Sequence, residues 1–271
     1  MSDLVKYEAP SLAAIDPADL AGMSISLDQV KNPSGGGLAF EVPNGTDSPD
    51  LVKELTGVIV DQHAAATLWL SDQNDGKPGA YSPDGVIQVV SDEGRALCGA
   101  NGWPQPTELL ATCPYNQWPS EGGFDTSLIK GKPTKAKATT NQRRLYVLQS
   151  GEMLPVVVNV TPASLHSFSD FMLKRITLKG KKLHHVLTTI SLEKVTKGGN
   201  TYSKMNFVLA GELPPEDAAA IDAFVPVIKQ LTRRETAVAA EVPVAPVAAG
   251  SGSFEQAFDA KPVGADDDIP F

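Results

Sequence analysis

The sequence predicts a mostly β fold with a few helices and a long C-terminal tail. Five runs rich in β-branched and aromatic residues are separated by Gly, Pro, Asn and Ser, a pattern typical of strands and turns. One amphipathic helical run separates the third strand from the fourth, and beyond Glu235 the chain loses its periodicity. With 271 residues, of which 42% are hydrophobic, the chain is long enough to bury a large core.

The first strand is expected in LVKELTGVIVDQHAAATLWL (51–70), as one long strand or as two strands interrupted near Gly57. The second and third strands are expected in RRLYVLQ (143–149) and LPVVVNV (154–160). A short connection of turn-forming residues joins these two runs, so they are predicted to form a hairpin.

A helix is expected over residues 161–180, with Thr161 and Pro162 as its cap and first turn. Its apolar residues recur at the spacing of one helical face: Leu165, Phe168, Met172 and Ile176. A second hairpin is expected from residues 184–195 and 202–213, because their connection contains two glycines and an asparagine.

The last predicted element is a helix over residues 214–234. It has prolines at its start, acids in its first turn and bases in its last turn, as the helix macrodipole favours. Pro226 lies in its interior and is expected to kink it.

In order, these elements are a strand, a hairpin, a helix and a second hairpin. That order matches the OB-fold, a five-stranded Greek-key barrel that binds oligonucleotides on one face; an unrelated α+β sheet is the alternative. The barrel is expected over residues 38–234, with a large insertion at 71–142 between strands one and two and a leader at 1–37. Residues 235–265 are expected to form a disordered linker to an acidic segment at 266–271.

The net charge of −9 is distributed unevenly along the chain. Residues 1–50 carry 8 acids and 2 bases and residues 235–271 carry 7 acids and 1 base, so each end has a net charge of −6. Residues 125–204 instead carry 14 bases and 4 acids, a net charge of +10. This asymmetry predicts a basic binding face with acidic tails; the alternative is a solvated charged face without a ligand.

Basic and aromatic residues alternate in this region, and single-stranded nucleic acid needs both, as cations for phosphates and flat rings for unstacked bases. Tyr146 and Tyr202 are favoured because a strand tyrosine can point its ring outward and keep its hydroxyl in water. Phe168, Phe171 and Phe207 are assigned to the core by their spacing. The residues expected to bind single-stranded DNA are Arg143, Arg144, Tyr146, Lys174, Lys194, Lys197, Tyr202, Lys204, Trp69 and Trp118.

No cofactor and no metal is expected, with zinc as the alternative. Cys98 and Cys113 are the candidate metal ligands, but two thiols supply half of a structural zinc shell. The histidines that could complete it are assigned to core or surface roles: His63, His166, His184 and His185. The sequence contains no Ser/His/Asp order, phosphate-binding glycine loop or HExxH helix, so an enzyme is not expected.

A cytoplasmic protein without membrane contact is expected. No run approaches 18 apolar residues, and the N-terminal residues lack the basic and then apolar order of a secretory signal.

The sequence ends on DDDIPF, after the linker-like residues 235–265. This segment resembles the acidic tip of bacterial single-stranded DNA-binding proteins, which binds partner proteins. The resemblance implies that Phe271 fills an apolar pocket of a replication or recombination enzyme while the acids meet basic residues around it. The residues concerned are Asp266, Asp267, Asp268, Ile269, Pro270 and Phe271.

Over residues 51–213 the segments GVIVDQH, CPYNQW and RRLYVLQSGEMLPVVV are similar to single-stranded DNA-binding proteins of phages and integrative elements. That resemblance implies an OB-fold. In such relatives the insertion resembles a zinc-bearing loop with more cysteines than the two found here.

The expected function is to coat and protect single-stranded DNA in replication or recombination and to recruit partner enzymes through residues 266–271. The alternative is a recombination mediator, annealing factor or interaction protein that mimics the host tip and has little DNA affinity of its own. Salt dependence separates the two, because a DNA-binding protein loses affinity steeply as salt rises.

Overall fold

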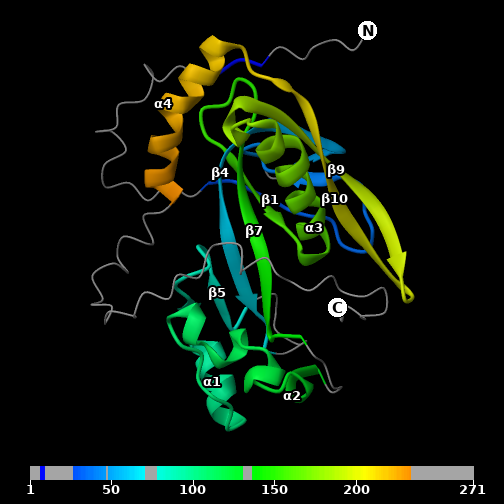
Figure 1. Ribbon diagram of the computed structural model, residues 1–271. Coiled ribbons are helices and arrows are strands. Elements are labelled where there is room, and N and C mark those ends of the chain that lie inside the picture. Colours follow the sequence, from blue (N-terminus) through cyan, green and yellow to red (C-terminus); the bar gives the residue numbers. More distant parts are fainter. Residues whose placement is uncertain (1–6, 10–26, 47, 71–77, 131–135, 233–271) are drawn as a thin grey trace.

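The computed structural model describes residues 7–9, 27–46, 48–70, 78–130 and 136–232. The fold is mixed α/β and dominated by strands, with a curled open sheet and a few helices (Figure 1). The predicted linker and acidic tip lie outside the described residues. None of the described helices is both long enough and apolar enough to cross a membrane.

The centre of the eight-stranded sheet is β4 (Glu54–Leu68). Its first residues pair antiparallel with β9 (Val186–Lys197), and the rest of it pairs antiparallel with β7 (Thr139–Leu148). On the outer sides, β8 (Val156–Val160) pairs with β7, and β10 (Asn200–Glu212) pairs with β9. Among the described strands β10 has no partner besides β9, so the sheet curls without closing.

The first predicted strand, expected as one long strand or as two interrupted near Gly57, forms the single long strand β4. The interruption near Gly57 is absent, since β4 runs through this residue, and a break lies earlier, at Lys53 between β3 (Asp50–Val52) and β4. Gly57 is instead a point of close contact, since a Cβ there would lie 2.6 Å from the carbonyl oxygen of Leu148.

The range predicted as a leader contributes to the sheet. Within it, β1 (Gln29–Val30) pairs in parallel with β8. The next strand, β2 (Phe40–Val42), pairs antiparallel with β3 in a separate two-stranded sheet.

The predicted central helix is confirmed, but its last part is not α-helical. The α-helix α3 (Pro162–Phe171) continues into a π turn (Met172–Ile176) and a 3₁₀ turn (Thr177–Lys179). The Thr161 hydroxyl makes no capping bond to the backbone and contacts the Ser164 hydroxyl at 3.0 Å. The C-terminal helix α4 (Pro215–Thr232) runs through Pro226.

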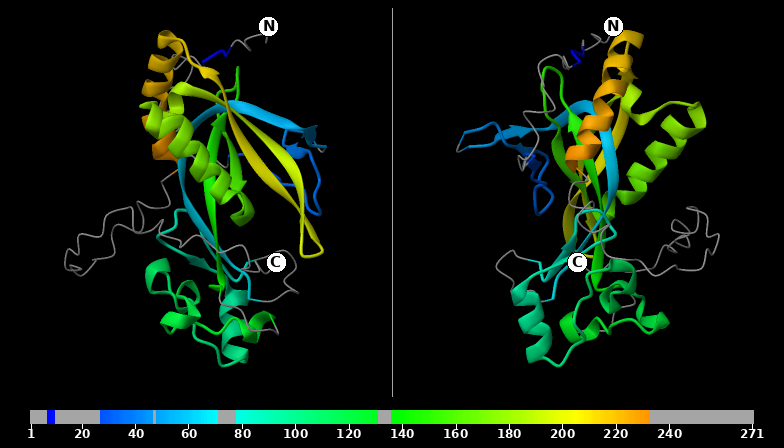
Figure 2. Two further views of the ribbon diagram at one scale, coloured as in Figure 1. Left: turned by 45° about the vertical axis from the view of Figure 1, so that its right-hand side comes forward. Right: turned by 90° about the vertical axis from the view of Figure 1, so that its left-hand side faces the viewer.

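The sheet buries a core on each of its faces because apolar residues alternate along β4 and β7. On the face that packs against α3, which we call the α3 face, Ile59 and Leu145 join Phe168 in one cluster. On the face that packs against α4, which we call the α4 face, Val60 and Tyr146 join a second cluster that includes α4 residues. Figure 2 shows the two helices on different sides of the strands. Phe168 and Phe171 are buried in the core, as predicted, and Phe207, also assigned to the core, is partly buried and packs against both rings.

The insertion folds beyond the end of β4 that lies away from α4 (Figure 1). It contains β5 (Ala80–Ser82), β6 (Val89–Val90), α1 (Asp92–Ala100) and α2 (Ser127–Lys130), and β7 begins at Thr139. These elements share a third core with the end of β4, formed by Leu68, Leu70, Ala80, Cys98, Cys113, Tyr115, Phe124 and Ala138.

The second hairpin is confirmed, although its first strand begins later than predicted. His184 and His185 lie on a 3₁₀ turn (Leu183–His185) and not on a strand, because β9 starts at Val186. Gly198 and Gly199 both have positive φ angles, as the type I′ two-residue hairpin turn requires.

Candidate nucleic-acid interface

The α4 face of the β4–β7 pair carries polar side chains on the half that lies toward the insertion. The register places His63 opposite Arg144, Ala65 opposite Gln142, and Thr67 opposite Thr140. Residues directly opposite one another share a sheet face, and residues two apart in a strand do as well. This half of the face differs from the half under α4, where Tyr146 and Leu148 belong to an apolar core.

Tyr81 extends this polar surface onto the insertion. In β5 it lies opposite Thr67, and in turn it lies opposite Val89 of β6. Its side chain is 40% exposed, whereas Ala80 and Ser82 on either side are buried. We call this set the ribbon surface: His63, Thr67, Tyr81, Thr140, Gln142 and Arg144.

The ribbon surface combines one exposed ring with one cation. Thr67 lies opposite Tyr81, and His63 lies opposite Arg144. Because Thr67 and His63 are four residues apart in β4, these two cross-strand pairs are roughly 13 Å apart along the strand. A nucleotide strand that spans this distance would meet the ring at one end and the guanidinium at the other. Sequence reasoning missed Tyr81, because a three-residue strand inside a Gly- and Pro-rich segment gives little periodic signal.

Arg143 and Arg144, which were predicted to act together, lie on opposite sheet faces. Arg143 is on the α3 face, where it donates a hydrogen bond to the Gln62 side chain, and its burial lowers the pKa of the guanidinium. Arg144 is on the α4 face, and its Nε atom is buried without a hydrogen-bond partner. Of the two, Arg144 belongs to the ribbon surface.

The prediction that the Tyr146 ring points into solvent is wrong. Only 3% of Tyr146 is exposed, because α4 packs over this part of the sheet with Ile221 and Phe224. Its ring lies 5.3 Å from the His63 ring, centroid to centroid, and its hydroxyl lies 3.5 Å from His63 Nε2. Tyr146 therefore supports a residue of the ribbon surface and cannot itself stack on a base.

Two exposed tryptophans lie at the insertion end of the β4–β7 pair. Trp118 is 45% exposed, and Lys137 places Nζ 5.2 Å from its ring centroid. Trp69 is 41% exposed and directly follows Leu68, the β4 residue opposite Thr139. Both predicted tryptophans are thus available to a ligand, close to the start of β7.

The remaining predicted residues of the second hairpin divide between its two faces. Tyr202 lies opposite Val195, and Lys204 lies opposite Glu193, with which it forms an ion pair at 3.0 Å. Hydrogen bonds from Asn206 and from Lys204 lower the pKa of Glu193.

Lys194 lies opposite Ser203, on the face that continues the α3 face. Its side chain runs beside Gly36, where a Cβ would come within 3.1 Å of the Lys194 stem. Lys197 is exposed and ends β9. The tip of this hairpin extends away from α4, as does the insertion (Figure 1).

Lys174 is placed apart from these residues. It lies in the π turn after α3 and forms an exposed ion pair with Asp170 at 2.6 Å. Because α3 packs on the α3 face, Lys174 does not contribute to the ribbon surface.

The candidate metal ligands Cys98 and Cys113 are both fully buried in the core of the insertion. Cys98 Sγ lies 3.1 Å from the Tyr115 hydroxyl, and burial raises the pKa of the Cys98 thiol. Among the described residues, the cluster of three His, Cys, Asp or Glu that could hold a metal is His184, His185 and Asp222, and it includes neither cysteine.

No family model, curated protein or solved structure matches the chain. The chemistry of the described surfaces and the pattern of the sequence therefore carry the functional assignment.

Proposed function

We propose that this protein is a cytoplasmic, non-enzymatic single-stranded DNA-binding protein that coats and protects DNA during replication or recombination. The observation that carries the proposal is the ribbon surface, where Tyr81 and Arg144 share a sheet face that α4 leaves uncovered. An exposed ring and a cation on one face are the two components that sequence-tolerant binding of single strands requires.

The strand pairing supports an OB-fold for the body. In that fold the first strand pairs with the second and the fourth, as β4 pairs with β7 and β9, and a helix connects the third strand to the fourth, as α3 does here. The face of strands two and three and the two loops beside it bind oligonucleotides in OB-folds. By this correspondence those loops are the insertion and the tip of the β9–β10 hairpin.

The chemistry of the surface favours single strands over duplexes. Tyr81, Trp69 and Trp118 offer rings to base faces that are accessible only when the strand is unpaired. Arg144 and the hairpin lysines Lys197 and Lys204 offer positive charge to the phosphates, and Gln142 and Thr140 offer hydrogen bonds. Lys204 would exchange its contact with Glu193 for a phosphate.

The segment Asp266–Phe271 is proposed to recruit partner enzymes. It lies outside the described residues, so this part of the proposal has its support in the resemblance to the acidic tip of bacterial single-stranded DNA-binding proteins. The role of the tip is separable from DNA binding, because the body supplies the ring and the cation.

The decisive experiment is fluorescence anisotropy of the full chain with a labelled oligo-dT of about 30 nucleotides and with a duplex of equal length. Measured at about 50 mM and 200 mM salt, the affinity for the single strand should fall with a log-log slope near −0.7 per phosphate contacted. Weak binding to the single strand, or equal binding to both DNAs, would contradict the proposal and favour a mediator that only mimics the tip.

The variant Tyr81→Ala tests the ribbon surface itself. Loss of one stacked base should weaken binding to oligo-dT by about 1–3 kcal/mol, whereas Tyr81→Phe should retain the affinity. The matched control is Leu178→Ala, which removes another exposed apolar side chain, 69% exposed, from the turn after α3. If Tyr81→Ala and the control behave alike, the bases do not stack at Tyr81.

A further inference from the structure

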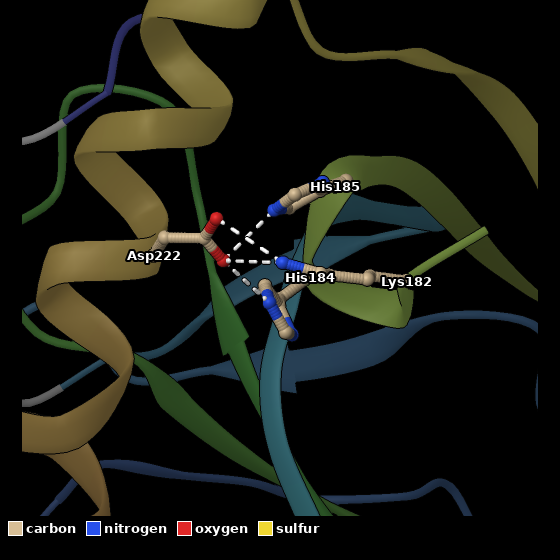
Figure 3. A network of polar contacts seen from close by, with 4 residues as sticks. All are labelled: Lys182, His184, His185 and Asp222. Atoms are coloured by element: carbon tan, nitrogen blue, oxygen red, sulfur yellow. Dashed lines mark hydrogen bonds and ion pairs between the residues drawn. The ribbon is translucent and has the colours of Figure 1, made fainter.

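Two adjacent histidines and an aspartate converge on one point between α4 and the turn that precedes β9 (Figure 3). Nε2 of His184 lies 2.9 Å and Nε2 of His185 lies 2.8 Å from the same oxygen, Oδ1 of Asp222. The rings of the two histidines are nearly perpendicular, with centroids 4.8 Å apart. One ligand atom from each of the three residues lies within 4.8 Å of the other two.

Two imidazole nitrogens and one carboxylate oxygen are ligands that suit Zn²⁺ and related divalent transition metals. The three side chains are partly exposed, by 26%, 28% and 42% in chain order, so an ion can enter from solvent and keep water as a further ligand. From these contacts we propose that His184, His185 and Asp222 form a binding site for Zn²⁺. This proposal is independent of DNA binding.

The arrangement needs only small changes to accept the ion. Each Nε2 atom now lies at hydrogen-bonding distance from Asp222 Oδ1. An Nε2 atom that donates this hydrogen bond carries its proton on the side where the metal would bind. Binding requires each Nε2 lone pair, and therefore the proton of each neutral imidazole moves to Nδ1. Zn–N distances are about 2.0–2.1 Å, so the carboxylate shifts by roughly an ångström to let the ion enter between the three groups.

Lys182 is the cation that now competes for this carboxylate. Its Nζ lies 3.3 Å from Oδ2 and 3.4 Å from Oδ1 of Asp222, so it contacts both carboxylate oxygens, including the one that the histidines contact (Figure 3). The Lys182 side chain is 58% exposed, so it can swing into solvent when Zn²⁺ binds. Its positive charge nevertheless opposes the ion, and removing that charge should strengthen binding.

The site joins elements that are distant in sequence. Asp222 belongs to α4, and the histidines belong to the 3₁₀ turn that leads directly into β9. Ile221 and Phe224, on either side of Asp222, are fully buried against the α4 face of the sheet. A bound ion would therefore hold α4 on the sheet and raise the stability of the folded chain, since the unfolded chain does not keep the three ligands together.

The test is a titration of the metal-free full chain with Zn²⁺, followed by calorimetry, and with Co²⁺, followed by visible absorption. The wild type should bind one ion at this site, and the melting temperature should rise by ~5 °C at a Zn²⁺ concentration about 100-fold above the dissociation constant. His185→Gln and Asp222→Asn should each lower the affinity about 10-fold or more. His166→Gln is the matched control, because His166 is exposed on α3 and distant from the cluster, and its affinity should equal that of the wild type.

Lys182→Gln gives a test in which all three proposed metal-binding side chains stay in place. This exposed side chain can be replaced without disturbing the core, and the affinity for Zn²⁺ should rise several-fold. An affinity unchanged or lowered in Lys182→Gln would overturn the proposal, as would equal affinity in the wild type, His185→Gln and Asp222→Asn. The second result would place any bound zinc elsewhere on the chain.

Discussion

Lys137 holds its ammonium group 5.2 Å from the centroid of the Trp118 ring, and that ring is still 45% exposed. Burial lowers the pKa of Lys137, while the nearby Glu121 opposes this effect. A cation within about 6 Å of an indole centroid is attracted to the ring face. The pair therefore places an exposed ring and a cation next to each other, close to the start of β7.

Trp118→Ala should weaken binding to oligo-dT by about 1–3 kcal/mol, because it removes one ring on which a base stacks. Trp118→Tyr should restore most of the affinity, since it keeps an aromatic face. Anisotropy titrations at one fixed salt concentration measure both effects. Leu128→Ala, a truncation of another exposed side chain of the insertion, is the control and should leave the affinity unchanged.

Arg144→Ala and Arg143→Ala should have different effects, because these neighbouring side chains lie on opposite faces of β7. Arg144→Ala removes one phosphate contact from the ribbon surface, so the log-log salt slope for single strands should become smaller by about 0.7. Arg143→Ala removes a partly buried hydrogen bond to Gln62, so it should lower the free energy of unfolding by about 1–3 kcal/mol and leave the salt slope unchanged.

Salt-dependent anisotropy and urea unfolding of both variants separate these outcomes. Arg175→Ala provides the control for loss of one surface charge, because Arg175 is exposed in the π turn after α3. An equal change in the log-log salt slope of Arg143→Ala and Arg144→Ala would show that DNA contacts both faces of the sheet. That result would contradict the proposal that DNA binds at the ribbon surface.

The order of the main strands could be predicted from the sequence because local pattern decides it. Runs of β-branched residues mark β7 and β8, and the glycines at 198 and 199 mark the turn of the second hairpin. The orientation of Tyr146 could not be predicted in this way. Alternation along β7 places its residues on two faces of the sheet. Tyr146 is buried because α4, which follows more than 60 residues later in the chain, packs over its face.

The parts of the candidate sites that sequence reasoning missed depend on contacts between distant segments. Tyr81 lies on a strand of three residues that exists because it pairs with the end of β4. Asp222 meets His184 and His185 across 38 and 37 positions of sequence, and nothing in the local pattern around α4 marks that residue as different from other exposed acids. Charge and composition indicate the class of ligand, whereas register decides which side chains meet it.

The thiols of Cys98 and Cys113 should react only slowly with Ellman's reagent while the protein is folded. Both side chains are fully buried, and burial raises the pKa of Cys98, which lowers the fraction present as reactive thiolate. Absorbance at the wavelength of the released thiolate should show a slow reaction in buffer and two rapid equivalents in denaturant. A fast reaction of the folded chain would show that the core of the insertion opens readily.

Tyr146 should stabilise the fold mainly through its ring. Its ring fills the core between the α4 face and helix α4, so Tyr146→Ala should lower the free energy of unfolding by about 3–5 kcal/mol. Tyr146→Phe keeps the ring and loses the hydroxyl, which lies 3.5 Å from His63 Nε2, so it should cost much less than Tyr146→Ala. Urea unfolding measures both changes, and anisotropy with oligo-dT should show wild-type affinity for Tyr146→Phe. A marked loss of DNA affinity in this variant at unchanged stability would mean that the hydroxyl reaches the DNA, which the burial of Tyr146 under α4 argues against.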